Sequence, residues 1–287
     1  MRHRPANALL AALACLVGLA LTGAVALILP IAQAHDSATL QGFTLLSGHS
    51  RLSRLATDLA HTVDPSRYAV LALLLAAVAL VRGRPRVALA VPLTMVAASA
   101  TSEILKPLVG HPRYSEWLSG GGTLLAASWP SGHATAAMMV ALCGVLVAPR
   151  LLRPAVALLG TGLAVGVSYS ILLLGWHFPS DVLGGFLVAG GWVALALAAL
   201  WQAEARWPEQ SARSALQRVS FRPGGSDLLV PAALLAATFG AAIGVVILRG
   251  RLVEAYGAAH LSFVAGALAI AGLAAMLATG MTVALRR

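Results

Sequence analysis

The chain has 287 residues, of which 59% are hydrophobic and only 10% charged, and its formal net charge is +10. This composition excludes an ordinary soluble domain and indicates a polytopic membrane protein. The arginines lie in short turns beside the apolar runs and form no continuous basic face, so we expect contact with anionic lipid headgroups of the bilayer and no nucleic acid partner.

Eight apolar runs come close to or exceed the roughly 20 residues that cross a bilayer as a helix. They predict an all-α, polytopic membrane helix bundle of about eight transmembrane helices, at about 7–34, 66–82, 87–106, 131–149, 155–175, 182–201, 228–249 and 261–284. The polar segment 202–227, with its prolines and paired glycines, is expected to be a cytoplasmic linker. It divides a six-span core over residues 1–201 from a C-terminal two-helix extension over residues 228–287.

The first run follows the basic sequence "MRHRP" and precedes "AQA", as the apolar part of a secretory signal would. It is about twice as long as such a segment, which favours an uncleaved first span. With the N-terminus inside, 13 of the 20 Lys and Arg residues fall in inner segments and 7 in outer segments. The positive-inside rule therefore predicts that both termini are cytoplasmic in a protein of the cytoplasmic membrane.

An amphipathic segment separates the first two runs. Leu52, Leu55, Leu59 and Val63 recur at helical spacing opposite Arg, Asp and His residues. This pattern predicts a helix that lies flat on the outer membrane surface. A lid that gates access of the substrate is the alternative interpretation.

Three polar stretches occupy the outer ends of the third to sixth runs. They are "SEILKPLVGHPRY" over 102–114, "PSGH" over 130–133 and "GWHFPSDVLGG" over 175–185. In the predicted topology all three lie on the extracytoplasmic side. Because polar side chains at membrane depth are costly and usually functional, we expect them to form one composite site.

Part of this set suits a phosphate group. Lys106 is the only lysine of the chain, and both Lys106 and Arg113 are cationic donors for phosphate oxygens. A lysine at a helix end can also extend to the headgroups, which is the alternative for Lys106. In "PSGH", Ser131 can cap the helix that begins there, and the free N–H groups at Gly132 and its neighbours can bind an anion.

The remaining residues suit nucleophilic and acid catalysis. His177 and Asp181 are four residues apart, so the carboxylate can hold one ring nitrogen and leave the other free to attack phosphorus. His133 can protonate the leaving oxygen. A membrane-interface histidine is the alternative for His177 alone. Metal-dependent phosphatases cluster several carboxylates, whereas these stretches combine one motif carboxylate with two cations, so no metal and no cofactor are expected.

In order and spacing, these three stretches resemble the signature of the type 2 phosphatidic acid phosphatase superfamily of integral membrane lipid phosphatases, over roughly residues 60–201. The resemblance implies metal-independent hydrolysis in which His177 forms a phosphohistidine, Asp181 orients it and His133 is the acid for the leaving alcohol. It also implies that four residues hold the phosphoryl oxygens, namely Lys106, Arg113, Ser131 and Gly132.

The sequence departs from the family pattern at two positions. Tyr114 follows Arg113 where the family has proline, and Ile171 replaces an arginine six residues before the nucleophilic histidine. The expected function is hydrolysis of an isoprenoid, phosphatidyl or glycolipid phosphate, either a monoester or a diphosphate. Because Ile171 removes a charged contact to phosphate, a non-catalytic lipid-phosphate-binding or transport partner protein is one alternative. A lipid phosphotransferase, in which an acceptor hydroxyl replaces water, is another.

Overall fold

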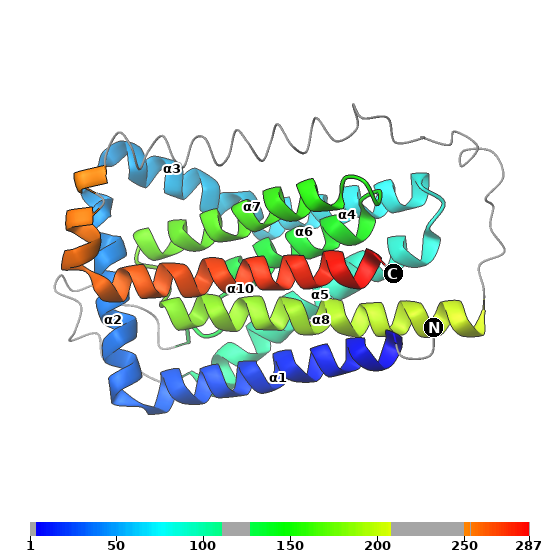
Figure 1. The fold of residues 1–287 in the computed structure, drawn as a ribbon, viewed down its shortest axis with the longest axis horizontal. Coiled ribbons are helices and arrows are strands. Elements are labelled where there is room, and N and C mark those ends of the chain that lie inside the picture. Colours follow the sequence, from blue (N-terminus) through cyan, green and yellow to red (C-terminus); the bar gives the residue numbers. More distant parts are fainter. Residues whose placement is uncertain (1–3, 111–126, 208–249, 253, 287) are drawn as a thin grey trace.

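The computed structural model describes residues 4–110, 127–207, 250–252 and 254–286, which form helices and turns without a strand (Figure 1). In chain order the helices are α1 (Arg4–Ile28), α2 (Pro30–Thr44), α3 (Ser50–Ala60), α4 (Pro65–Val81), α5 (Pro85–Val109), α6 (Gly132–Val147), α7 (Arg153–Leu173), α8 (Pro179–Arg206) and α10 (Leu261–Arg286). Short 3-10 turns, η1 (Leu45–Gly48) and η2 (His61–Val63), flank α3.

The architecture is an all-α membrane helix bundle, as the sequence predicts. Five described helices are long and apolar enough to cross a bilayer, or six when α3 with η2 and α4 are counted as one bent span. Helix α6 is shorter, with 16 residues. Helices occupy seven of the eight predicted runs, and the eighth, at 228–249, lies outside the described residues together with most of the expected linker.

The first span ends earlier than predicted. Helix α1 stops at Ile28, and Leu29 adopts an extended conformation before Pro30 begins α2. A residue before proline is driven out of the helical conformation, whereas proline itself fits the first helical turn. The apolar run that continues to residue 34 therefore contains two helices, and α2 crosses the end of the bundle at a steep angle to α1 (Figure 1).

The amphipathic segment is helical, and part of its predicted apolar stripe packs on the bundle: Val63 is buried and Leu59 packs on the core. Helix α3 packs against α7 and is followed, after η2, by α4 at a bend of 54°. Ala56 and Ala60 are buried, whereas Leu55 is 66% exposed. Small side chains allow helices to approach closely, so the two alanines contact the bundle beside Leu59, whereas Leu55 points away from it.

Helix α6 forms the centre of the bundle and contacts α4, α5, α7, α8 and α10. Most of its side chains are buried, including Met138, Met139 and Leu142. Of the predicted two-helix extension, α10 is described, and it packs directly on α2, α6, α7 and α8. The Tyr169 hydroxyl donates to the Ala267 carbonyl over 2.7 Å and joins α7 to α10.

The described chain ends and the polar stretches lie at opposite ends of the bundle. The described ends of the chain lie at one end, while α2, α3 and the α7–α8 turn lie at the other (Figure 1). Helix α8 continues to Arg206, so residues 202–206 of the expected linker are helical. The end of α5 and the starts of α6 and α8, which carry the described parts of the three polar stretches, are therefore at the opposite end of the bundle from the described ends of the chain.

Candidate active site

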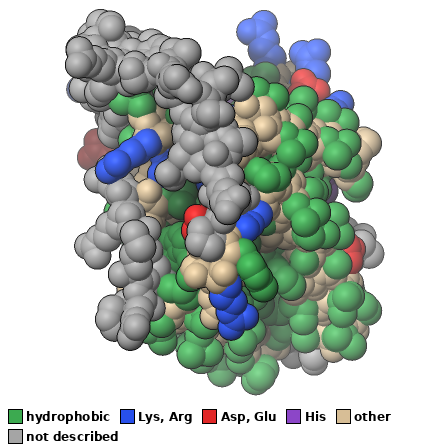
Figure 2. Space-filling view, turned by 90° about the vertical axis from the view of Figure 1, so that its right-hand side faces the viewer, with side chains coloured by type: hydrophobic (Ala, Val, Ile, Leu, Met, Phe, Trp, Pro, Cys, Tyr) green, Lys and Arg blue, Asp and Glu red, His purple; other side chains and the backbone are tan. Residues whose placement is uncertain are grey.

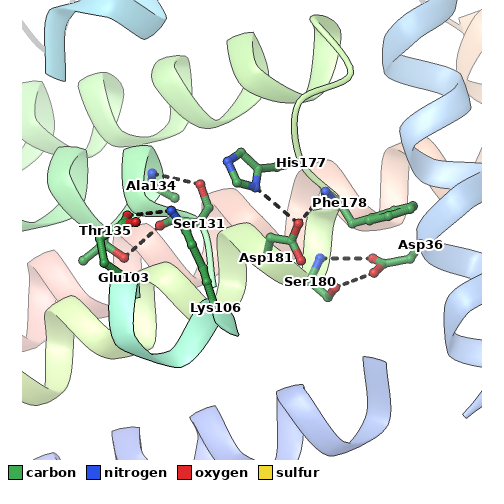
Figure 3. A network of polar contacts seen from close by, with 10 residues as sticks. All are labelled: Asp36, Glu103, Lys106, Ser131, Ala134, Thr135, His177, Phe178, Ser180 and Asp181. Atoms are coloured by element: carbon green, nitrogen blue, oxygen red, sulfur yellow. Dashed lines mark hydrogen bonds and ion pairs between the residues drawn. The ribbon is translucent and has the colours of Figure 1, made fainter. Parts of the chain in front are cut away.

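The candidate site forms where α5 ends and where α6 and α8 begin (Figure 3), and the start of α4 lies beside it through the contact of Asp64 with His133. Three of these four helix ends are N-termini, whose free N–H groups carry partial positive charge. Each predicted site residue in the described part of the chain lies within about one turn of one of these four helix ends. The site is therefore built from helix termini that the bundle brings together.

His177 and Asp181 form a pair at the start of α8. His177 Nδ1 lies 3.3 Å from Asp181 Oδ2, and the same oxygen accepts a 2.9 Å hydrogen bond from the Phe178 N–H. Asp181 is fully buried, and the His177 side chain is only 12% exposed. The carboxylate thus caps the helix while it holds one ring nitrogen, which leaves Nε2 of His177 available for a substrate.

The turn before His177 ends α7 and fixes where the histidine emerges. Gly175 has a φ of +70°, a conformation that suits glycine after the last helical turn. The N–H groups of Gly175 and Trp176 donate to the carbonyls of Leu172 and Ile171 over 2.9 Å each. This closed turn carries the chain directly into α8, so the position of His177 is set by backbone hydrogen bonds.

The start of α6 is held against α8. Ser131 is the N-cap, and its Oγ accepts from the Ala134 N–H at 3.3 Å. The Ser131 N–H donates to the Asp181 carbonyl over 2.9 Å. Gly185 of α8 lies so close that a Cβ there would be 2.7 Å from the Ser131 carbonyl oxygen. The two motif-bearing helix starts therefore form one rigid unit.

Lys106 reaches the start of α6 from the end of α5. Its Nζ lies 2.5 Å from Glu103 Oε1, and a Cβ on Gly132 would lie 3.2 Å from that oxygen and 3.5 Å from Nζ. Ser102 and Thr135 join the same two helices through a 2.9 Å hydroxyl contact. The ammonium group and the N–H groups at the start of α6 thus border one space that is suited to an anion.

His133 lies on the first turn of α6 and faces the same space. Its ring centroid is 6.4 Å from that of His177 and 5.7 Å from that of Trp176. Its Nε2 lies 3.6 Å from Asp64 Oδ1 at the start of α4. The fold therefore brings together six of the seven predicted site residues, namely Lys106, Ser131, Gly132, His133, His177 and Asp181.

The seventh predicted residue, Arg113, lies outside the described residues, as does Tyr114. Ile171 is fully buried in the apolar core, and its carbonyl serves the turn before His177. Its side chain offers no contact to a phosphate. Among the described residues, Lys106 is the cationic side chain at the start of α6.

Sequence reasoning missed two acidic residues near the site. Asp64 contacts His133, and Asp36 of α2 accepts hydrogen bonds from the Ser180 N–H, at 3.0 Å, and from the Ser180 hydroxyl. Asp36 therefore helps to hold the first turn of α8, beside Asp181 (Figure 3). The expected single motif carboxylate is thus joined by further carboxylates, although no group of three or more His, Cys, Asp or Glu among the described residues is arranged to hold a metal ion.

Figure 2 shows the opposite end of the bundle, where the described ends of the chain lie, and the described surface there is largely hydrophobic. Blue and red side chains are sparse and lie singly or in small groups among green ones in this view. On the site side, α5, which carries Lys106, exposes the large apolar side chains Leu93, Ile104 and Leu108, and these suit contact with lipid tails.

Comparison with known proteins relates the sequence and the fold to one superfamily. Residues 87–207 match the model of the PAP2 superfamily. Among solved structures, the chain is similar to a transmembrane PAP2-type phosphatidylglycerolphosphate phosphatase from Bacillus subtilis, at 21% sequence identity and a TM-score of 0.55. The match covers 68% of this chain and 96% of that one, and at this identity it shows the fold. No curated protein matches the sequence.

Proposed function

We propose that this chain, a member of the PAP2 superfamily through residues 87–207, is a membrane enzyme that hydrolyses the phosphate monoester or diphosphate of a lipid. The observation that supports the proposal best is the pair of histidines. The ring centroids of His133 and His177 are 6.4 Å apart, and Asp181 contacts Nδ1 of His177. A phosphoryl group placed between them would have a nucleophile on one side and an acid on the other.

In the first step, Nε2 of His177 attacks phosphorus and the bond from phosphorus to the leaving oxygen breaks. Asp181 stabilises the positive charge that develops on the ring of His177. Protonated His133 gives its proton to the leaving oxygen, so the lipid departs as a neutral alcohol, or as a lipid phosphate when the substrate is a diphosphate. The product on the enzyme is a phosphohistidine.

In the second step, water attacks the phosphohistidine. His133, now neutral, accepts a proton from that water, and the bond from phosphorus to Nε2 breaks. Inorganic phosphate leaves, and both histidines return to their starting states. In a phosphotransferase, which remains the alternative within the same class, an acceptor hydroxyl replaces the water in this step.

The phosphoryl oxygens are expected to bind at the start of α6. Lys106 supplies a charge, Ser131 and Gly132 supply donors at the helix N-terminus, and Arg113 supplies a second charge. Positive charge that a metal provides in other phosphatases would come here from these side chains and from the helix end. This is the basis for the proposed metal independence.

The proposed substrate is an isoprenoid, phosphatidyl or glycolipid phosphate. Its tail would enter sideways between apolar helices while its headgroup meets the polar space. With both termini in the cytoplasm, as the positive-inside rule predicts, the site faces the extracytoplasmic side of the cytoplasmic membrane. The location of both described chain ends away from the site supports this orientation.

A non-catalytic lipid-phosphate binder is the second candidate, and Ile171 is the observation that favours it. The family pattern has an arginine there, and the loss of one charge-assisted contact in a transition state can cost several kcal/mol. The Ile171 side chain has no hydrogen-bond donor and is buried in the core, so it cannot replace the phosphate contact of that arginine.

The decisive experiment is a phosphate-release assay on the full-length protein, purified in detergent and supplied with a chelator. The panel should contain phosphatidic acid, phosphatidylglycerol phosphate, which the structural neighbour is named for, and an isoprenoid diphosphate. Turnover of at least one lipid that His177→Ala abolishes supports the enzyme. Saturable binding of the same lipids without phosphate release would support the binder and reject the enzyme.

A further inference from the structure

Asp64 begins α4 but does not cap it. It is the N-cap residue, a position where aspartate normally accepts a hydrogen bond from an N–H of the first turn. Within the described part of the chain, its carboxylate makes no such bond. A capping bond of this kind is typically worth about 1 kcal/mol. The side chain therefore forgoes a local stabilising contact, and its two oxygens are used elsewhere.

Both oxygens face histidines. Asp64 Oδ2 lies 2.8 Å from Nδ1 of His61, and Oδ1 lies 3.6 Å from Nε2 of His133. The 54° bend between η2 and α4 is located at this residue and turns it toward α6. Because the two contacts use different oxygens, His61 can fix the carboxylate while the other oxygen remains available to His133.

The surroundings of the carboxylate are ordered by further contacts. The Arg67 guanidinium donates to the His61 carbonyl over 2.8 Å. The Trp176 ring packs near both histidines, and its centroid lies 6.0 Å from that of His61 and 5.7 Å from that of His133. Asp64 and His61 lie outside residues 87–207, so the family match does not include this part of the site.

We propose that Asp64 is the positioning residue for His133. This inference rests on the proposed function. The carboxylate holds Nε2 of His133 and stabilises the protonated ring, and the other ring nitrogen then faces the leaving oxygen. Contacts to a catalytic histidine are often long before substrate binds and shorten in the complex, which agrees with the 3.6 Å separation. The site would thus contain two carboxylate–histidine pairs, Asp181 with the nucleophile and Asp64 with the acid.

A residue that acts through the general acid has a specific kinetic effect. An alkyl lipid phosphate releases an alkoxide that needs a proton, whereas p-nitrophenyl phosphate releases a stable phenolate that does not. Loss of Asp64 should therefore slow the first substrate much more than the second. A residue with only a structural role would slow both substrates alike, because both need the same nucleophile and the same phosphate contacts.

The test measures kcat/KM on phosphatidic acid and on p-nitrophenyl phosphate for the full-length protein. For Asp64→Asn we expect a loss of at least about tenfold on phosphatidic acid, part of the roughly 100- to 10,000-fold that a positioned acid contributes, and less than about threefold on the aryl ester. Asp58→Asn removes the same charge from an exposed position of α3 and is the matched control, with both values unchanged.

Two further variants keep the test independent of folding. Asp64→Ser removes the carboxylate but supplies a hydroxyl that caps α4 well, so it should unfold at the wild-type temperature or above and still show the selective loss. In a His133→Ala background, Asp64→Asn should cause no further loss, because its effect passes through His133.

The outcomes separate this inference from the proposed function. Equal losses on both substrates, or additive losses in the double variant, would overturn the role of Asp64 while the enzyme itself stands. A wild-type protein that releases phosphate from neither substrate nor from the lipid panel would overturn the proposed function, and the role of Asp64 with it. Selective loss on phosphatidic acid, with no additional loss in the double variant, supports both.

Discussion

Replacement of Gly185 by alanine is expected to separate α6 from α8 and to disturb the site. A Cβ at Gly185 would lie 2.7 Å from the Ser131 carbonyl oxygen and 3.0 Å from the Thr135 nitrogen. Both neighbours are backbone atoms near the start of a buried helix, so neither can swing aside. Relief from 2.7 Å to the 3.4 Å of ordinary contact requires the helices to move apart by about 0.7 Å.

The size of the effect follows from what this contact holds. The Ser131 N–H donates to the Asp181 carbonyl over 2.9 Å, and a displacement of about 0.7 Å along that bond would lengthen it to about 3.6 Å, beyond hydrogen-bonding range. Overpacking of this kind typically costs about 1–3 kcal/mol of stability. Because a misplacement on the order of 1 Å can cost about 100-fold in rate, we expect kcat to fall at least about tenfold.

Thermal unfolding followed by tryptophan fluorescence, together with phosphate release from phosphatidic acid, measures both effects in the same detergent. Gly191→Ala is the control on the same helix, because its Cβ would meet Cys15 at 3.6 Å, an ordinary contact. If Gly185→Ala and Gly191→Ala showed equal unfolding temperatures and equal kcat, the close approach of α6 and α8 would not be what positions the site.

Three smaller predictions address other parts of the bundle. Gly132→Ala places a methyl group 3.2 Å from Glu103 Oε1 and 3.5 Å from Lys106 Nζ, so KM for the lipid phosphate should rise about three- to tenfold at an unchanged unfolding temperature; an unchanged KM would contradict phosphate binding there. Asp36→Ala removes both hydrogen bonds to Ser180 and should lower the free energy of unfolding by about 1–3 kcal/mol, which urea titration would measure. Tyr169→Phe removes the 2.7 Å bond to α10 and should cost about 0.5–1.5 kcal/mol in the same titration without a change in kcat, whereas a loss of activity would link α10 to the site.

Local patterns allowed the sequence to predict much of the site. His177 and Asp181 are four residues apart at the start of a helix, and that spacing places the two side chains next to each other on successive turns. Ser131 precedes a helical run, and its N-cap contact with Ala134 follows from that position. These features depend on a few neighbouring residues, so tertiary packing does not alter them.

Features that arise from packing between distant segments were not predictable. Nothing in the spacing of Asp64 relates it to His133, because the two residues meet only after α4 and α6 pack together. The break at Leu29 was also missed, since the apolar run continues through Pro30 and hydropathy does not register a change in backbone direction. The neighbours of α10 were equally hidden, because a helix that is apolar on all sides gives no indication of which face packs.

The convergence of helix N-termini explains how the site can hold acids and bind an anion at once. The start of α6 contacts the starts of both α4 and α8, since His133 approaches Asp64 and Ser131 is bonded to Asp181. Each N-terminus favours negative charge nearby. At α4 and α8 this charge is a carboxylate of the protein, and each carboxylate contacts a histidine. The first turn of α6 has no acidic side chain of its own, and the nearby carboxylate, Glu103 of α5, is paired with Lys106. Under the proposed function, the phosphate of the lipid would supply the negative charge at this third N-terminus.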